Sequence, residues 1–298
     1  MVHSDVQQLN EPSQDATRLN RAFIIGIVLN AAFVIIEFGI GFHYHSLSLL
    51  SDAGHNLGDV ASLVLAMLAL RLTKVHPTSV YTYGYKKSTI LVSLLNAVIL
   101  LVTVGIIISE SIHKLAHPVA VEGSAIAWTA GVGVVINAIT AWLFLKNKNK
   151  DLNVKGAYLH MAADTLVSVG VVISGIIIMY TGWTLLDPII GLLIAVVIVV
   201  STWSLLRDSL RLSLDGVPVG MDSEKIKKII LSQPGVVNCY HLHIWAISTT
   251  ETALTAHVSI EHIEQMREIK HAIKQALHQA GITHATLEFE CEGVSCWG

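Results

Sequence analysis

The chain has 298 residues, of which 53% are hydrophobic and only 14% are charged, and its formal net charge is −3. Soluble domains carry about 25% charged residues, so this composition indicates a membrane protein. The small net charge excludes the strongly basic surface that general nucleic-acid binding requires, and we expect no nucleic-acid partner.

Six segments are long and apolar enough to cross the hydrocarbon core, which takes about 20 residues in a helix. In chain order they are residues 22–42, 47–70, 89–111, 124–145, 154–180 and 188–206. The first 20 residues are polar and predict a cytosolic tail. The pattern therefore predicts an α-helical membrane domain with six transmembrane helices over residues 21–207.

The pattern changes after residue 207. Residues 221–233 and 261–280 have the spacing of amphipathic helices, and residues 236–248, 252–261 and 284–290 read as strands. The order helix–strand–strand–helix–strand predicts a small cytosolic α+β domain of the ferredoxin-like (αββαβ) type over residues 208–298.

Lysine and arginine gather in alternate loops. Two loops carry four each, while the loops on the other side carry one between them; the residues are Arg71, Lys74, Lys86 and Lys87, then Lys146, Lys148, Lys150 and Lys155, against Lys114. Because cytosolic loops are enriched in positive charge, both termini are predicted to be cytosolic, where disulfides are rare. The short loops favour a prokaryotic inner (plasma) membrane, by analogy.

Two of the predicted membrane segments repeat one motif. His55 and Asp59 are four residues apart in 47–70, and His160 and Asp164 are four apart in 154–180, so each pair shares a helix face. A charge at the bilayer centre costs about 2.5–3.5 kcal/mol, so such residues pair, line water or bind an ion. One interpretation is a private His–Asp hydrogen bond in each helix; the other is one shared metal site.

The four side chains together make a two-histidine, two-aspartate set, which suits tetrahedral Zn²⁺. The two carboxylates would neutralise a dication, and metal and protons would compete for the same ligand atoms. Counted from the predicted segment ends, the first pair lies about six residues deeper than the second, or about 9 Å along a helix. The sequence thus predicts a metal site at His55, Asp59, His160 and Asp164, if the helices allow the pairs to meet.

Five stretches carry a resemblance to a known family. They are "SDAGHNLGD" (51–59), "YTYGYKKSTILVSLLN" (81–96), "HMAADTLVSVG" (160–170), "DPIIGLLIA" (187–195) and "LRDSLRLSLDGVP" (206–218). Over about residues 20–290 the chain resembles the cation diffusion facilitator family, in its zinc-transporter branch. The resemblance implies a homodimer that exports divalent metal from the cytosol in exchange for protons, by alternating access, with the transport site at the four residues above. Histidine at position 55 implies zinc as the metal.

The resemblance also implies a zinc site in the soluble domain, which dimerises in relatives. Its ligands by position would be His257, His271, Glu288 and Glu290, with Cys291 and Cys296 as substitutes. Tyr240 stands where a ligand histidine is expected, and Glu288 stands where some relatives have histidine. The alternative is that these are solvated strand and helix residues. If zinc binds, it would stiffen the domains only when cytosolic zinc is high.

Two other function classes compete with transport. An intramembrane zinc protease would need a motif such as HExxH, which the sequence lacks, and four protein ligands leave no open position for catalytic water. A metal sensor with a membrane anchor would not need acids in two separate helices. The sequence therefore predicts a transporter and no enzyme.

Overall fold

The computed structural model describes residues 14–43, 47–116, 124–181 and 185–291. The chain divides into two compact units, one of Met1–Arg71 with Leu95–Leu205 and one of Leu72–Leu94 with Leu206–Gly298. Each unit is described by itself below. The boundary at 207/208 stays a prediction.

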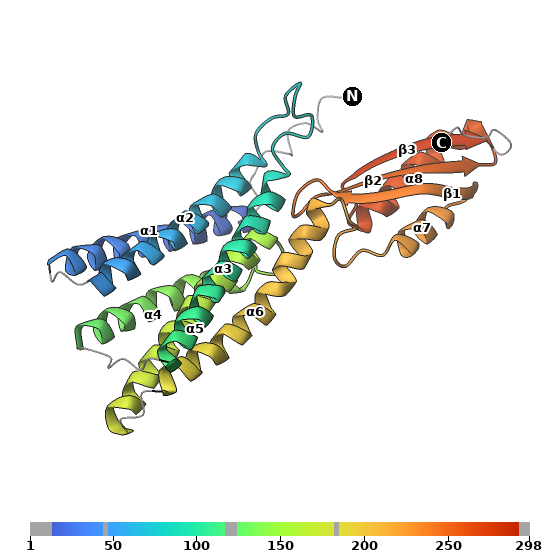
Figure 1. Ribbon diagram of the computed structural model, residues 1–298. Coiled ribbons are helices and arrows are strands. Elements are labelled where there is room, and N and C mark those ends of the chain that lie inside the picture. The colour runs from blue at the N-terminus through green and yellow to red at the C-terminus, as the bar shows by residue number, and fades with distance from the viewer. Residues whose placement is uncertain (1–13, 44–46, 117–123, 182–184, 292–298) are drawn as a thin grey trace. The chain divides into compact units, whose positions relative to one another are not determined.

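Six long helices follow one another in the order that the hydropathy predicts (Figure 1). They are α1 (Gln14–His43), α2 (Leu47–Leu72), α3 (Ser88–Ala116), α4 (Ser124–Leu145), α5 (Leu152–Thr181) and α6 (Leu186–Ser213). Within the described residues, three stretches are long and apolar enough to cross a membrane: Leu19–Ile40, Ser88–Ala116 and Pro188–Ser213. A helical membrane domain is confirmed, and the number of six crossings stays a prediction.

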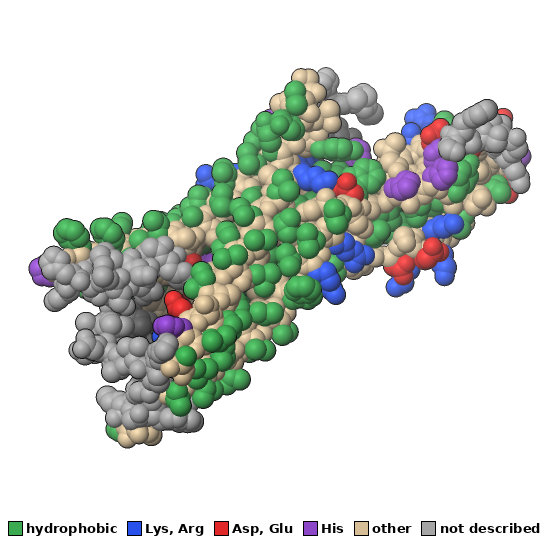
Figure 2. Space-filling model, viewed as in Figure 1, with side chains coloured by type: hydrophobic (Ala, Val, Ile, Leu, Met, Phe, Trp, Pro, Cys, Tyr) green, Lys and Arg blue, Asp and Glu red, His purple; other side chains and the backbone are tan. Residues whose placement is uncertain are grey.

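The first unit has apolar side chains both inside and outside. Helix α4 packs against α5 and α1, and Phe23 of α1 meets Phe144 of α4 with ring centroids 4.7 Å apart. Large apolar residues such as Ile35 and Val200 are about 70% exposed, and hydrophobic side chains spread over the visible surface of the helices (Figure 2). Such a surface is stable in lipid and not in water.

The C-terminal domain has the predicted order of elements. Helix α7 (Ser223–Leu231) is followed by β1 (Val236–Ala246), β2 (Thr252–Ile260), α8 (Met266–Gln279) and β3 (His284–Cys291). Strand β2 lies in the middle of the sheet, antiparallel to β1 and parallel to β3. Both helices bury their apolar faces against the same side of the sheet, which confirms the αββαβ arrangement.

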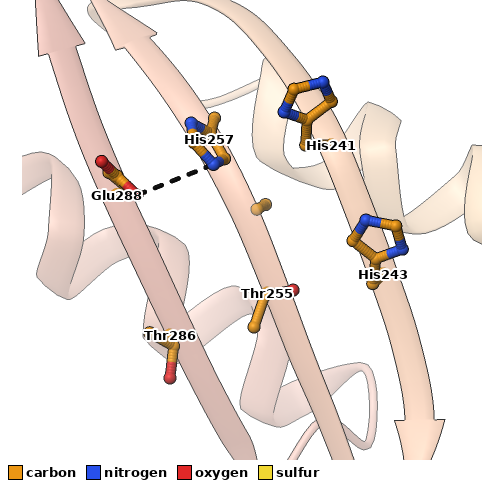
Figure 3. A pocket seen from close by; sticks show the side chains of 7 residues that line it. His241, His243, Thr255, His257, Thr286 and Glu288 are labelled. Carbon is orange, nitrogen blue, oxygen red and sulfur yellow. Dashed lines mark ion pairs between the residues drawn. The ribbon is translucent and has the colours of Figure 1, made fainter. Parts of the chain in front are cut away.

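The opposite face of this sheet carries the polar side chains. Leu254, Ala256 and Val258 of β2 enter the core shared with α7 and α8, so alternation puts Thr255 and His257 on the other face. His257 is the register partner of Glu288 on β3. Strand β1 has a register irregularity between Tyr240 and His243, where His241 adopts a φ of 47°. His241 and His243 stand on the same face as His257 (Figure 3), and the extra residue of the bulge lets Tyr240 share that face.

Candidate metal centres

One cluster of ligand-type side chains is formed by two helices of the first unit. Asp59 comes from α2, and His160 and Asp164 come from α5. The Nε2 atom of His160 lies 2.5 Å from Oδ1 of Asp59 and 3.7 Å from Oδ2 of Asp164. The two helices therefore meet at the repeated motif, and the depth difference counted along the sequence does not prevent contact between Asp59 and His160.

This cluster is buried. The side chains of Asp59 and His160 are 2% and 5% exposed. Leu63, one helical turn after Asp59, and Met161, next to His160, are fully buried. The Oδ2 atom of Asp59 has no hydrogen-bond partner among the described residues. A carboxylate oxygen without a partner in an apolar setting is unfavourable unless a proton or a cation reaches it. The donor set of one imidazole and two carboxylates fits a divalent ion.

The fourth predicted ligand is His55. His55 lies in α2, one helical turn before Asp59, but its side chain is outside the described residues. The structure thus brings together three of the four predicted side chains. The role of His55 stays a prediction.

Polar contacts hold α1 beside this cluster. Asn56 of α2 donates to Oε2 of Glu37 at 2.7 Å, and Glu37 is fully buried in α1. Asn30 of α1 donates to the backbone oxygen of Gly26 and to Thr140 of α4. In the sequence Asn56 directly follows His55 and lies close to the helix face that His55 and Asp59 share, and a buried amide at that place needs partners.

The second cluster lies on the open face of the sheet. The Nδ1 atom of His257 lies 2.9 Å from Oε1 of Glu290. Its Nε2 atom lies 3.6 Å from Oε2 of Glu288, the ion pair drawn as a dashed line in Figure 3. The ligand atoms of these three residues all lie within 4.8 Å of one another. His257 and Glu288 are 23% and 67% exposed, so this cluster is open to solvent.

Tyr240 takes part in the second cluster as a hydrogen-bond donor. Its hydroxyl donates to Oε2 of Glu290, and its ring lies 5.5 Å from that of His257. The hydrogen bond from Tyr240, then the one from His257, hold the pKa of Glu290 below its ordinary value. The same bond to Glu290, together with desolvation, raises the pKa of Tyr240. A metal ion at Glu290 would therefore compete with an existing hydrogen bond.

The remaining predicted cytosolic ligands are not part of this cluster as described. His271 is exposed on α8, which packs against the opposite side of the sheet from His257. Cys291 ends β3, but its side chain is outside the described residues, as is all of Cys296. The roles of these three residues stay predictions.

Comparison with known proteins covers nearly the whole chain. Residues 23–212 match the family model for the cation efflux transmembrane domain, and residues 218–290 match that for the cytoplasmic domain of cation efflux proteins. The zinc transporter ZitB of Escherichia coli is 33% identical over 99% of this chain and 96% of its own length. The cadmium, cobalt and zinc/H(+)-K(+) antiporter of Bacillus subtilis is 32% identical over 91% of this chain and 89% of its own.

A third relative is the metal cation efflux system protein CzcD of Cupriavidus metallidurans, which is 36% identical over 91% of this chain and 86% of its own length. All three relatives are transporters of metal cations by name, and both family models describe cation efflux proteins. The chain therefore belongs to the cation diffusion facilitator family of membrane transporters and is not an enzyme.

Proposed function

We propose that this protein exports Zn²⁺ from the cytosol in exchange for protons, through a site made of His55, Asp59, His160 and Asp164. The observation that carries the proposal is the meeting of Asp59 of α2 with His160 and Asp164 of α5 in a buried position. Alternating access would expose this site to one side of the membrane at a time, by two-state rocking of helices.

The contact between Asp59 and His160 supports proton coupling. At 2.5 Å the two side chains share a hydrogen bond, which needs a proton on one of them. Zinc binds neutral imidazole and ionised carboxylate, so any proton on this pair beyond the single N–H of neutral imidazole must leave when the ion binds. Protons arriving from the other side of the membrane would in turn release the ion.

The geometry is compatible with zinc. Ligand atoms about 2.0–2.2 Å from a tetrahedral ion lie roughly 3.4 Å from one another. The ligand atoms of Asp59, His160 and Asp164 lie within 4.8 Å of one another, so modest side-chain movements would close the shell. Imidazole favours zinc and other late first-row ions over magnesium or calcium. Relatives named for zinc, and for cadmium, cobalt and zinc, support this substrate class.

The cytosolic domain completes the proposal. We place both termini in the cytosol of a prokaryotic inner membrane and expect the protein to act as a homodimer through this domain. His257, Glu288 and Glu290 would bind a second zinc ion when cytosolic zinc is high, with Cys291 and Cys296 as further ligands. His271 lies on a helix at the opposite side of the sheet, so it would reach this ion only from the partner protomer. The close contacts of His257 with both glutamates support this assignment.

The test is zinc flux in proteoliposomes with an imposed pH gradient, comparing the wild type with Asp59→Ala and Asp164→Ala. We expect gradient-driven uptake of radioactive zinc in the wild type and none in either variant. Flux that survives both substitutions would place the transport site elsewhere. A wild type that moves zinc equally well without the gradient would overturn proton exchange.

A further inference from the structure

The seam where α5 meets α3 and α6 changes character along its length. Past His160 toward the end of α5, the seam is an apolar core of Val104, Ala163, Ala195 and Ile198. At the start of α5, beside the lysine-rich segment 146–155, the same three helices bury several polar side chains among apolar ones such as Val154 and Leu205. An apolar seam would pack equally well at both ends, so packing alone does not explain the buried polar groups at this end.

Asn153 is the most unusual of these polar residues. It is fully buried, and neither its Oδ1 nor its Nδ2 atom has a hydrogen-bond partner among the described residues. It precedes His160 by seven residues and Asp164 by eleven, so all three share one face of α5. Asn153 therefore lies about 10 Å along the helix from the candidate metal site, on the same face.

Two further side chains repeat this pattern on the neighbouring helices. Asn96 of α3 and Thr202 of α6 are buried, and Oδ1 of Asn96 and Oγ1 of Thr202 have no partner in the part of the chain that is described. The helices touch at this level. A Cβ atom on Gly156 of α5 would lie 3.5 Å from Leu205 of α6 and 3.7 Å from Cβ of Asn96. Three helices thus bring three incompletely satisfied polar groups to one end of the seam.

Buried polar atoms without partners destabilise the arrangement that buries them. Separation of α5 from α3 and α6 at this end would let water satisfy all three groups, so the closed seam is poised to open. Amide and hydroxyl oxygens also suit a hydrated divalent cation, which they can contact through its water shell.

We propose that Asn96, Asn153 and Thr202 form the cytosolic gate of the transport path, which admits a hydrated divalent cation on its way to His160. The proposal rests on the proposed function for its direction and its cargo. In the structure described here the gate is closed, because Asn153 is fully buried.

Replacement of Asn153 by leucine tests the gate, since leucine has a similar size and leaves no unsatisfied atoms. We expect Asn153→Leu to unfold at the same or a higher temperature than the wild type, while zinc flux in proteoliposomes falls on the order of tenfold. Thr202→Val should likewise lower zinc flux without lowering the unfolding temperature. Asn153→Ser, which keeps a hydrogen-bonding group, should retain most of the flux.

Asn137 provides the matched control. It is a buried asparagine whose Oδ1 atom also lacks a described partner, but it belongs to α4, outside the seam. Asn137→Leu should leave the flux unchanged. Equal slowing by Asn137→Leu and Asn153→Leu would overturn the gate, as would normal flux in both Asn153→Leu and Thr202→Val. A wild type without zinc flux would overturn the proposed function itself, which is a distinguishable result.

Cysteine accessibility tests the opening without relying on flux ratios. Asn153→Cys is made in a chain whose Cys239, Cys291 and Cys296 are replaced by serine. During transport in inverted vesicles, a membrane-impermeant thiol reagent added on the cytosolic side should modify the residue at position 153 and stop flux. A thiol that stays unmodified while the variant transports zinc would overturn the proposal.

Discussion

The two ligand clusters contain the same groups, one histidine and two carboxylates, in opposite surroundings. Asp59, His160 and Asp164 are 2%, 5% and 11% exposed, whereas His257 and Glu288 of the cytosolic cluster are 23% and 67% exposed. The third member of the cytosolic cluster, Glu290, is 8% exposed, but both of its oxygens are hydrogen-bonded, to Tyr240 and to His257. Buried carboxylates need a proton or a cation close by, while exposed ones are stabilised by water. We therefore expect an ion or a proton to be required at the first cluster and optional at the second.

The largest expected effect follows from removal of a charge at the buried cluster. Asp164→Asn should lower zinc flux by at least about 100-fold, because loss of a direct ligand exceeds the 10–100-fold effect of losing an outer hydrogen-bond partner. Zinc uptake into proteoliposomes measures this.

Asp151→Asn is the control, at the residue that directly precedes α5. Asp151 is buried and accepts hydrogen bonds from the backbone of Asn153 and Val154, a capping role that asparagine fills equally well. Its flux should stay near that of the wild type. An equal loss of zinc flux in Asp164→Asn and Asp151→Asn would show that flux depends on any buried acid in or next to α5. The buried cluster would then have no special role in transport.

The next effect concerns the exposed cluster. Glu290→Gln should weaken zinc binding there by about tenfold or more, since the residue contacts His257 directly and loses its charge. Flux at saturating zinc should change by less than about twofold. Equilibrium zinc binding to the full chain, in an Asp164→Asn background, isolates the cytosolic cluster. If Glu290→Gln lost as much zinc flux as Asp164→Asn, zinc binding at the cytosolic cluster would be required for transport, which contradicts the expectation.

Tyr240 is expected to weaken zinc binding at the cytosolic cluster. Its hydroxyl occupies Oε2 of Glu290, so Tyr240→Phe should free that oxygen and tighten zinc binding a few-fold, on the order of three- to tenfold. Equilibrium zinc binding to the full chain in the Asp164→Asn background measures this effect. Tyr81→Phe is the matched control, because Tyr81 is an exposed tyrosine outside the cluster. Weaker binding in Tyr240→Phe would mean that the tyrosine oxygen is itself a ligand.

The smallest effect is a dependence of stability on pH. The pKa of Glu290 is held below its ordinary value by Tyr240 and His257, so its ionised form stabilises the fold above the ordinary glutamate range. This contribution is lost as pH falls through the lowered pKa. Thermal unfolding of the full chain from pH 7 to pH 4 should therefore show a steeper fall in midpoint for the wild type than for Glu290→Gln. Parallel curves would show that the hydrogen bonds leave no net stabilisation.

Most of the helical architecture is predictable from hydropathy. The segment 124–145 coincides with α4 at both ends, because its apolar run is bounded by polar loops. Helix α6 runs to Ser213, seven residues beyond the predicted segment end at 206. Hydropathy predicts which residues lie in lipid and does not predict where a helix ends. The residues after Leu206 are more polar, yet α6 continues through them to Ser213.

Some features of the candidate sites are predictable from the sequence, and others are not. The four-residue spacing of His160 and Asp164 identifies the buried cluster, since a shared helix face is a local property. Contacts between distant segments are not local, so the sequence did not indicate that Tyr240 donates to Glu290, fifty residues away. The unsatisfied amide of Asn153 is equally invisible in the sequence, because its lack of partners depends on how three helices pack.

The most direct test of the central claim is calorimetric titration of zinc into the full chain in buffers of different ionisation enthalpy, with His257→Ala removing the cytosolic cluster. We predict one ion bound per chain with release of at least one proton, and loss of both signals in Asp59→Asn. Zinc binding that releases no proton, or that persists in Asp59→Asn, would contradict a shared site for metal and protons at Asp59, His160 and Asp164.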